Sequence, residues 1–491
     1  MKRILPLLLL SLSLLAGCRD TQLPEQYTTS PDSVLIYPDY QGVTVPQNIA
    51  PLTFHIDTEA DDYRCRMSDG RHTWVYAGRD VCPTEKQWRK LQGTVLVEVF
   101  VLRSDTWTRL CPFHIYVSQD PIDPYLTYRL IAPSYVTYED LTLCQRNLTN
   151  YDESIIYGNM ANSTERSGQC INCHAVQNYN PDRFQFHVRQ GHAGTLIAWD
   201  GEVRHVNLKT DKTISAGTYP AWHPTEKLIA YSTNLTSQAF HTRSNAKVEV
   251  QDSYGDLMLY DLERNEVLDL ENDTSNLDCF PHWSPDGQWL YYCSARYERF
   301  DTTGTISREY DLMQNYQRVR YNLYRRPFDL PTRSFGPRQM VYDAEADSMS
   351  ATLPRLSPNG RWLMFTRARY GVFHIWHPDA DLYLTDLQTG QTRPLEELNS
   401  PQTESYHAWS SSSRWVVFSS RRTDGNFTRP FIAHIDAEGR CTKPFELPSR
   451  QPEYHRQLLR SYNVPEFMLG PVVQRPQELA RIIRKPAIQA Q

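Results

Sequence analysis

The sequence lacks a strong charge bias, long apolar runs beyond its first residues, and common motifs of hydrolytic enzymes. Its net charge of −6 over 491 residues is small and the two signs are mixed, which argues against a nucleic-acid-binding protein. No two glycines stand four residues apart, so a Gly-x-Ser-x-Gly nucleophile elbow is absent, and no His-Glu-x-x-His zinc motif occurs. These absences favour a role that is not enzymatic.

Apolar residues form one long run, at the start of the chain. Lys2 and Arg3 precede a leucine-rich stretch over residues 4–15, which is too short for a membrane-spanning helix and has the length of a signal-peptide core. The run ends in Leu-Ala-Gly-Cys18, which resembles the lipobox of bacterial lipoproteins. In those proteins the cysteine becomes the lipidated first residue of the mature chain. An ordinary secretory signal followed by a chance cysteine is the alternative.

These features predict where the protein resides. We expect residues 1–18 to be a lipoprotein signal peptide and the polar residues 19–32 to be a tether. No later run is apolar enough to span a bilayer, so the mature protein would be exported and held by its lipid in a Gram-negative envelope, at the outer membrane. The ten cysteines are compatible with an oxidising compartment, and Cys279 and Cys293, which flank one predicted hairpin, could pair.

The composition predicts a mainly β fold with more than one domain. The chain has 30 Tyr, 11 Trp and 32 Pro and few helical runs, and it is too long for one simple core. Short segments over residues 33–118, several with alternating polarity, predict an immunoglobulin-like or fibronectin-like β-sandwich.

An internal repeat dominates the second half of the chain. Each copy has a strand ending in an aromatic residue or leucine, a four-residue turn, and a second strand of aromatic and aliphatic residues. The turn Ser284-Pro-Asp-Gly287 suits this role, because proline presets φ and glycine accepts a positive φ. A second strand pair follows each hairpin, and four strands per irregular repeat are typical of propeller blades. The aligned copies are residues 219–232, 280–293, 353–366 and 406–419.

This pattern resembles the TolB-like β-propeller repeat, with its apolar-Ser-Pro-Asp-Gly-x-aromatic turn. The resemblance covers residues 195–450 and implies a propeller of five or six blades. Residues 195–208 look like half a blade that another part of the chain completes, and residues 451–491 would close the propeller and end in a tail. The resemblance implies no particular activity, because such propellers serve in several roles.

The chemical signal is Cys170-Ile-Asn-Cys173-His174, within residues 119–194. C-x-x-C-H is the attachment motif of c-type haem, in which two thiols add to the porphyrin vinyl groups and the histidine ligates the iron. A zinc site would need further ligands with structural spacing, and a thioredoxin-like pair would need a βαβ pattern. Neither is present, which leaves a haem site or its degenerate relic.

The sixth iron ligand is chosen from residues near the motif. His187 and His192 follow His174 by enough chain to reach over a haem face, and Met160 precedes it. We expect His187 to be the ligand and Arg189 to pair with a haem propionate. The alternatives are a loop histidine, a packed methionine and a solvated arginine.

Together, the motif and its flanks resemble a group of Gram-negative envelope lipoproteins that join one haem-binding motif to a TolB-like propeller. The resemblance implies the fold and one covalent haem c, and no activity. Our hypothesis is that the haem serves electron transfer or redox sensing and that the propeller docks an envelope protein or an electron donor or acceptor. The alternative is a non-redox envelope scaffold for protein or glycan, with a structural haem or none.

Overall fold

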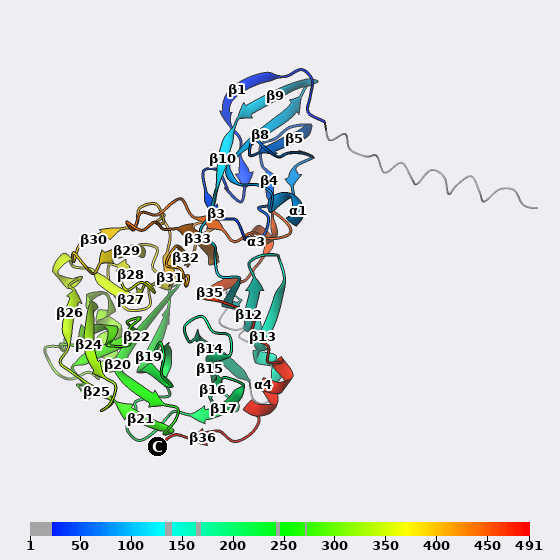
Figure 1. Cartoon of the computed structure of the whole chain (residues 1–491). Coiled ribbons are helices and arrows are strands. Elements are labelled where there is room, and N and C mark those ends of the chain that lie inside the picture. Colours follow the sequence, from blue (N-terminus) through cyan, green and yellow to red (C-terminus); the bar gives the residue numbers. More distant parts are fainter. Residues whose placement is uncertain (1–21, 133–139, 164–167, 242–245, 271–272) are drawn as a thin grey trace, which may run out of the picture. The chain divides into compact units, whose positions relative to one another are not determined.

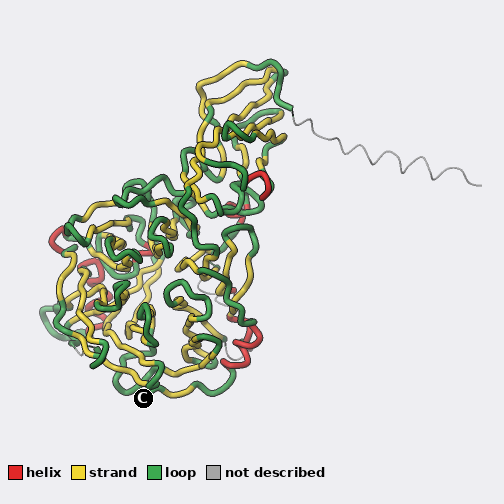
Figure 2. Tube along the Cα trace, viewed as in Figure 1, coloured by secondary structure: helices red, strands yellow, loops and turns green. Residues whose placement is uncertain are grey.

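A computed structural model describes residues 22–132, 140–163, 168–241, 246–270 and 273–491. The predicted signal peptide, with Cys18, lies outside the described residues. The fold is mainly β, as the composition predicts: strands run through the whole described chain and the helices are short (Figure 2). Among the described residues, no helix has both the length and the apolar character needed to cross a bilayer. The chain divides into two compact units.

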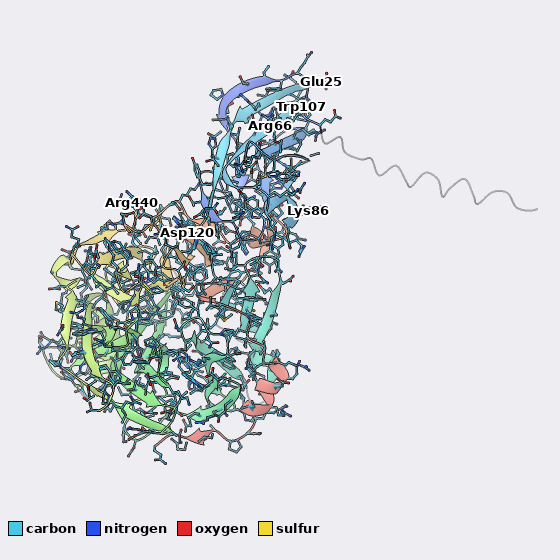
Figure 3. All side chains as sticks on the ribbon, in the orientation of Figure 1. Glu25, Arg66, Lys86, Trp107, Asp120 and Arg440 are labelled. Carbon is cyan, nitrogen blue, oxygen red and sulfur yellow. The ribbon has the colours of Figure 1, made fainter. Side chains whose placement is uncertain are left out.

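The first unit holds described residues 22–42, 51–117 and 450–453. Its buried Glu98 accepts hydrogen bonds from Arg66 and, at 3.0 Å, from Arg109, and Arg64 lies over the ring of Trp107. Arg66 and Trp107 are labelled in Figure 3. This unit has two sheets. The larger contains β1 (Thr28–Ser33), β9 (Thr106–Cys111), β8 (Gly93–Arg103), β10 (Phe113–Ser118), β5 (Asp62–Ser68) and β6 (Thr73–Ala77). The smaller contains β2 (Ile36–Tyr37), β4 (Phe54–Ile56) and β7 (Asp80–Val81), and the short helix α1 spans Glu85–Trp88. Burial alternates along β5 and β10, as the sequence pattern of a half-buried strand predicts.

The second unit is built from six groups of four antiparallel strands, which we name by their first strand. They are the β35 sheet, with β11, β12 and β13; the β14 sheet, with β15, β16 and β17; the β18 sheet, with β19, β20 and β21; the β22 sheet, with β23, β24 and β26; the β27 sheet, with β28, β29 and β30; and the β31 sheet, with β32, β33 and β34 (Figure 1).

The strand bounds follow the chain. They are β3 (Thr44–Pro46), β11 (Tyr125–Ile131), β12 (Thr142–Asn147), β13 (Glu153–Gly158), β14 (Gln169–Val176), β15 (Arg183–Gln190), β16 (Gly194–Trp199), β17 (Glu202–Asn207), β18 (Thr218–Trp222), β19 (Leu228–Phe240), β20 (Val248–Asp261), β21 (Glu266–Asp269), β22 (Asn276–Trp283), β23 (Trp289–Arg296), β24 (Asn322–Asp329), β25 (Ser334–Phe335), β26 (Gln339–Tyr342), β27 (Ser350–Leu356), β28 (Trp362–Ala368), β29 (Asp381–Asp386), β30 (Thr392–Pro394), β31 (Glu404–Trp409), β32 (Trp415–Ser420), β33 (Arg429–His434), β34 (Phe445–Glu446), β35 (Ser461–Met468) and β36 (Ile488–Gln489). The helices are α2 (Arg308–Asn315), α3 (Tyr454–Gln457) and α4 (Pro476–Ile483).

The strand pairs over residues 195–208 are completed by another part of the chain, as the repeat predicts. β16 and β17 pair in sequence with β15, and β15 pairs with β14. The boundary expected between residues 194 and 195 therefore falls inside β16, after its first residue. The predicted pairing of Cys279 with Cys293 is not formed: both are free thiols, at directly opposed positions of β22 and β23.

The six first strands contact one another in cyclic order: β35, β14, β18, β22, β27, β31 and again β35. Each carries one residue with a positive φ next to a shift of register, which is the geometry of a β-bulge. The six bulge residues are Cys173, Tyr219, Phe280, Leu353, Tyr406 and Val464.

Tryptophans of the repeat join neighbouring sheets. The indole N–H of Trp222 donates to the carbonyl of Ala175 at 3.2 Å, and that of Trp283 donates to the carbonyl of Ala221 at 3.1 Å. Trp409 makes the same bond to Arg355 at 3.1 Å. Because a buried indole N–H needs an acceptor, this contact explains why three of the four copies have tryptophan at this position.

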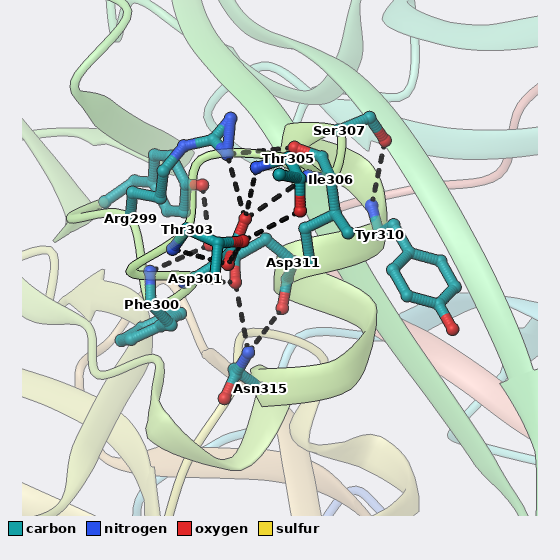
Figure 4. Close-up of polar contacts among 11 residues, drawn as sticks. Arg299, Phe300, Asp301, Thr303, Thr305, Ile306, Ser307, Tyr310, Asp311 and Asn315 are labelled. Carbon is teal, nitrogen blue, oxygen red and sulfur yellow. Dashed lines mark hydrogen bonds and ion pairs between the residues drawn. The ribbon is translucent and has the colours of Figure 1, made fainter.

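An inserted segment between β23 and β24 is held by two aspartates (Figure 4). The buried carboxylate of Asp311 accepts hydrogen bonds from the backbone N–H groups of Phe300 and Asp301 at 2.8 and 2.9 Å, and from the hydroxyl of Tyr297 at 2.8 Å. Asp301 in turn accepts bonds from the residues that lead into α2, so these acids order a loop without regular structure.

The turn glycines offer a matched test of the repeat. Gly287 and Gly360 occupy the same place in two turns, with φ of 69° and 72°. A Cβ at Gly287 would lie 2.4 Å from Nε2 of His223, whereas one at Gly360 would meet nothing within 4 Å. We expect Gly360→Ala to lower the free energy of unfolding by about 1 kcal/mol through the positive φ alone, and Gly287→Ala by about 1–3 kcal/mol more. Urea unfolding of both variants measures the difference, and equal losses would contradict the packing of His223 on this turn.

Candidate cofactor site

The C-x-x-C-H motif lies in β14, at the position that the repeat occupies in the other first strands. Cys173 is the bulge residue, with φ of 54°, and His174 stands where Pro220, Pro281, Pro354 and Pro465 stand in four other sheets. In the β31 sheet this position is also a histidine, His407. The motif is therefore part of a fifth copy of the repeat, whose turn has lost Ser-Pro-Asp-Gly.

Both thiols of the motif line one cavity of about 490 Å³, which we call the thiol cavity. The bulge brings Cys170 and Cys173 to the same face, although residues three apart on a regular strand point to opposite faces. Asn172 links them, since its Nδ2 lies 3.6 Å from Sγ of Cys170 and its Oδ1 accepts from the thiol of Cys173 at 3.4 Å. The side chain of Gln185 donates to the carbonyl of Cys173 and holds the bulge from β15.

Two arginines line the thiol cavity without an acidic partner. Arg189 lies directly across from Cys170 in the register of β14 and β15, and Arg129 comes from β11. Within the described parts of the chain, neither guanidinium has an ion pair or hydrogen bond, and the Nε of Arg129 is buried. Unpaired guanidinium groups at a cavity favour an anionic ligand, because carboxylate and phosphate match their geometry.

Aromatic rings form much of the remaining wall. Arg421 stacks over the ring of Trp376 at 3.7 Å and donates to the carbonyls of Ile375 and Asn426. Tyr219 and Tyr406 line the same cavity. The wall thus offers flat apolar surface beside the positive charges.

His174 is buried beside this cavity but is not among the residues that line it. Burial, and then the nearby guanidinium of Arg129, lower the pKa of His174 to about 3, so the imidazole is neutral. Neither ring nitrogen makes a hydrogen bond of ordinary geometry within the described residues. By contrast, Nε2 of His407 at the equivalent position lies 3.0 Å from the carbonyl of Met364.

The structure does not bring the expected sixth ligands to the cavity. His187 is buried in β15, opposite Asn172, and its Nδ1 lies 3.1 Å from the hydroxyl of Thr195. Burial, Arg189 and His205 lower the pKa of His187 to about 3. His192 is exposed in the loop after β15, and Met160 is 62% exposed.

Sequence reasoning found Cys170, Cys173 and Arg189 and missed Arg129, Arg421 and the aromatic wall. No local pattern marks the missed residues, because they come from β11, from the segment after β32 and from several bulges far apart in the sequence. The one available signal was the shared Cys173-His-Ala and Tyr406-His-Ala sequences, which align the motif with the repeat.

The residues around the thiol cavity fit a c-type haem in their chemistry. Two cysteines line one cavity, guanidinium groups that meet no acid in the described ranges suit the two propionates, and aromatic side chains suit the flat ring. The adjacent imidazole is neutral, which is the form of histidine that ligates metals, and the backbone of Val464 is a polar group near its ring in the described structure.

A buried carboxyl next to the cavity wall predicts a pH dependence of stability. Asp252 accepts hydrogen bonds from Asn234 and from the cavity-lining Thr236, each at 2.8 Å, and burial raises its pKa to about 7. Because the native state then holds a proton that the unfolded chain has lost, stability falls as pH rises from about 4 to 7 and levels off above. The loss is up to about 1 kcal/mol per pH unit.

Unfolding by urea at pH 5, 6, 7 and 8 measures this loss. We expect Asp252→Asn to make the profile less steep over this window, with the slope of other buried carboxyl groups such as Glu466 remaining, whereas Asp211→Asn, at an exposed position, should leave it unchanged. A wild-type profile that already matches that of Asp252→Asn would contradict a protonated Asp252.

Comparison with known proteins yields fold-level neighbours of low similarity. No family model matches the chain, and no curated protein does. Among solved structures, a prolyl endopeptidase shares 12% identity over 67% of this chain and 42% of its own, with a TM-score of 0.35. A puromycin-hydrolyzing peptidase of Mycobacterium tuberculosis shares 15% over 87% and 57%, at 0.34, and a GH74 enzyme of Niastella koreensis shares 12% over 66% and 46%, at 0.38.

This chain spans about half the length of those structures. Such TM-scores carry no argument about function, so the interpretation below depends on the chain's own residues.

Proposed function

We propose that this protein carries one covalently attached c-type haem in the thiol cavity and acts in electron transfer or redox sensing. The observation that carries the proposal is that Cys170 and Cys173 line one cavity with the guanidinium groups of the half-buried Arg129 and the exposed Arg189, for which the described residues offer no acidic partner. A lone C-x-x-C-H sequence would not require such surroundings.

Each residue then has a distinct part. Cys170 and Cys173 would form the thioether links, His174 would supply the axial nitrogen, and Arg129 and Arg189 would hold the propionates. When bound, the haem supplies one-electron chemistry. The chain's own groups bind it, orient it through the bulge of β14, and set its surroundings with aromatic rings that exclude water.

We infer that the second unit is a six-bladed β-propeller, the larger of the two predicted blade numbers. Six groups of four antiparallel strands, two of them joined by a parallel pair of β20 with β22, and the cyclic contacts of their first strands support this inference. The last blade would combine β35, from the end of the chain, with β11, β12 and β13, from before the motif. This inference extends the propeller beyond the expected residues 195–450 on both sides.

The remaining expectations form part of the same proposal. A lipid on Cys18 would hold the protein at the outer membrane, the first unit would be a sandwich of immunoglobulin or fibronectin type, and the propeller would dock an envelope protein or redox partner. No nucleic acid is involved.

One observation favours a second candidate, a non-redox envelope scaffold. The Cys173-His174 pair occupies the same bulge as Tyr406-His407, so the repeat alone explains a histidine there. In that case the thiol cavity would hold no haem and the propeller would act by docking alone.

Absorbance spectroscopy separates the two candidates. The chain is expressed with a periplasmic cytochrome c maturation system and examined as its pyridine haemochrome. We expect a c-type spectrum at about one haem per chain. Arg129→Gln with Arg189→Gln should keep the covalent haem and shift its potential, because the propionates lose their partners. A correctly processed, colourless product would support the scaffold.

A further inference from the structure

A second cavity, of about 410 Å³, lies on the other side of the six bulge residues along the first strands. We call it the ring cavity, because the residue two places after each bulge lines it. Three of these six positions are alanine and three carry charged or titratable groups: Ala175, Ala221, His282, Arg355, Ala408 and Glu466.

The charged groups of the ring cavity are not paired with one another. Arg355 and Glu466 flank Ala408 in the cyclic order of strands, yet they form no ion pair within the described residues. Nη1 of Arg355 donates to the carbonyl of Pro354 at 3.0 Å, and the carboxylate of Glu466 accepts from the backbone N–H of Val176 at 3.2 Å. Both side chains are half-buried, and an opposite pair of partly desolvated charges that do not meet is costly unless a ligand bridges it.

The three alanines leave the space between these charges open. The wall above it is apolar and made of the repeat's own residues: Trp222, Trp283, Trp409, Pro224, Pro285 and Pro358. The indole N–H groups are already bonded to backbone carbonyls, so these tryptophans offer ring surface rather than hydrogen bonds.

We propose that the ring cavity binds a short peptide with both ends free, its α-carboxylate at Arg355, its α-ammonium at Glu466 and its side chains on the tryptophan and proline wall. The charge complementarity selects this occupant: an anion alone would leave Glu466 unpaired, and a cation alone would leave Arg355 unpaired. His282 adjoins Arg355 in the ring and adds a second group that can contact the carboxylate end. The proposal does not depend on a haem in the thiol cavity.

The partial burial of the Glu466 carboxyl group is consistent with a site that binds a cation. It raises the pKa of Glu466 to about 7, against the opposing effect of Arg355. An ammonium group at hydrogen-bond distance would stabilise the charged carboxylate, and the binding experiment is therefore done at pH 8.

The test is isothermal titration calorimetry of the mature chain with Gly-Phe-Gly and with its N-acetylated and C-amidated forms. We expect the free tripeptide to bind and each cap to weaken binding about tenfold or more. In Arg355→Gln the C-terminal amide should make no further difference, and in Glu466→Gln the acetyl group should make none. Arg296→Gln, at an exposed arginine, is the control and should bind like the wild type.

Two results would overturn the proposal. One is the absence of binding by Gly-Phe-Gly at millimolar concentration, and the other is equal binding of the capped and free peptides, which would indicate apolar adsorption. Near-ultraviolet circular dichroism checks that the variants fold. If a variant does not fold, the comparison of free and capped peptides on the wild-type chain still tests the proposal. Binding retained in the Cys170→Ser/Cys173→Ser variant separates this outcome from that of the haem proposal.

Discussion

A chain that ends at residue 459 should fail to form a cooperatively folded second unit. The truncation removes β35, which pairs with β11 from Tyr125–Met468 to Ile131–Ser461 and contacts β14 and β31. Without it the β11 strand loses its inner partner and the ring of first strands is open. Tyr462, Phe467 and Met468 are buried, and burial of each such side chain contributes about 1.5–3 kcal/mol. Loss of α4 adds Leu479 and Ile483, so the total approaches the whole stability of a typical domain, about 5–15 kcal/mol.

A shorter truncation provides the control. A chain that ends at Lys485 loses the edge strand β36, in which Ile488 is 51% exposed, and keeps β35 and α4. We expect it to unfold cooperatively with a modest loss of stability. Thermal unfolding by circular dichroism compares the two, and a sharp native-like transition in the chain ending at residue 459 would contradict closure by β35.

The second large effect concerns the thiols. In the presence of a maturation system, Cys170→Ser with Cys173→Ser should abolish covalent haem, because no other thiol lines the cavity in the described structure. Each single variant should retain at most one thioether link and stain weakly. Cys144→Ser, at a buried thiol outside the cavity, should carry haem like the wild type.

His174 is tested separately, because the repeat has a histidine, His407, at the equivalent position of another sheet and can therefore explain His174 without a haem. If it ligates iron, His174→Ala should leave poorly attached, misligated haem. Proline is the residue that four other first strands have at this position, so His174→Pro should preserve the β14 sheet while removing the imidazole. A stable His174→Pro protein with an unchanged haem spectrum would exclude His174 as the ligand.

The sequence predicted four copies of the hairpin repeat, because their strands share one aromatic and aliphatic pattern around a four-residue turn. That turn is Ser-Pro-Asp-Gly or Ser-Pro-Asn-Gly in two copies, and the copy over residues 406–419 has lost both the proline and the glycine. The sequence could not identify the copies at Cys173 and Val464, where the turn residues differ and the shared feature is a backbone bulge with positive φ. The thiol cavity was beyond sequence reasoning for a related reason. Its second arginine, Arg129, reaches it only because β11 pairs with a strand some 330 residues later, and no local pattern predicts such a pairing.

His187 is the opposite case, a residue that the sequence suggested as a ligand and that does not line the thiol cavity. Its distance along the chain from His174 allowed it to reach a haem, but strand pairing fixes it beside Thr195. The number of residues between two histidines limits how far apart they can lie, whereas strand pairing determines which way each side chain points.

The most direct test of the central proposal is the intact mass of the denatured, purified chain after expression with a cytochrome c maturation system. We expect the wild type to be heavier than its processed polypeptide by one haem and the Cys170→Ser/Cys173→Ser variant to have the mass of the polypeptide alone. A wild-type chain without added mass, correctly processed and folded, would contradict covalent haem in the thiol cavity.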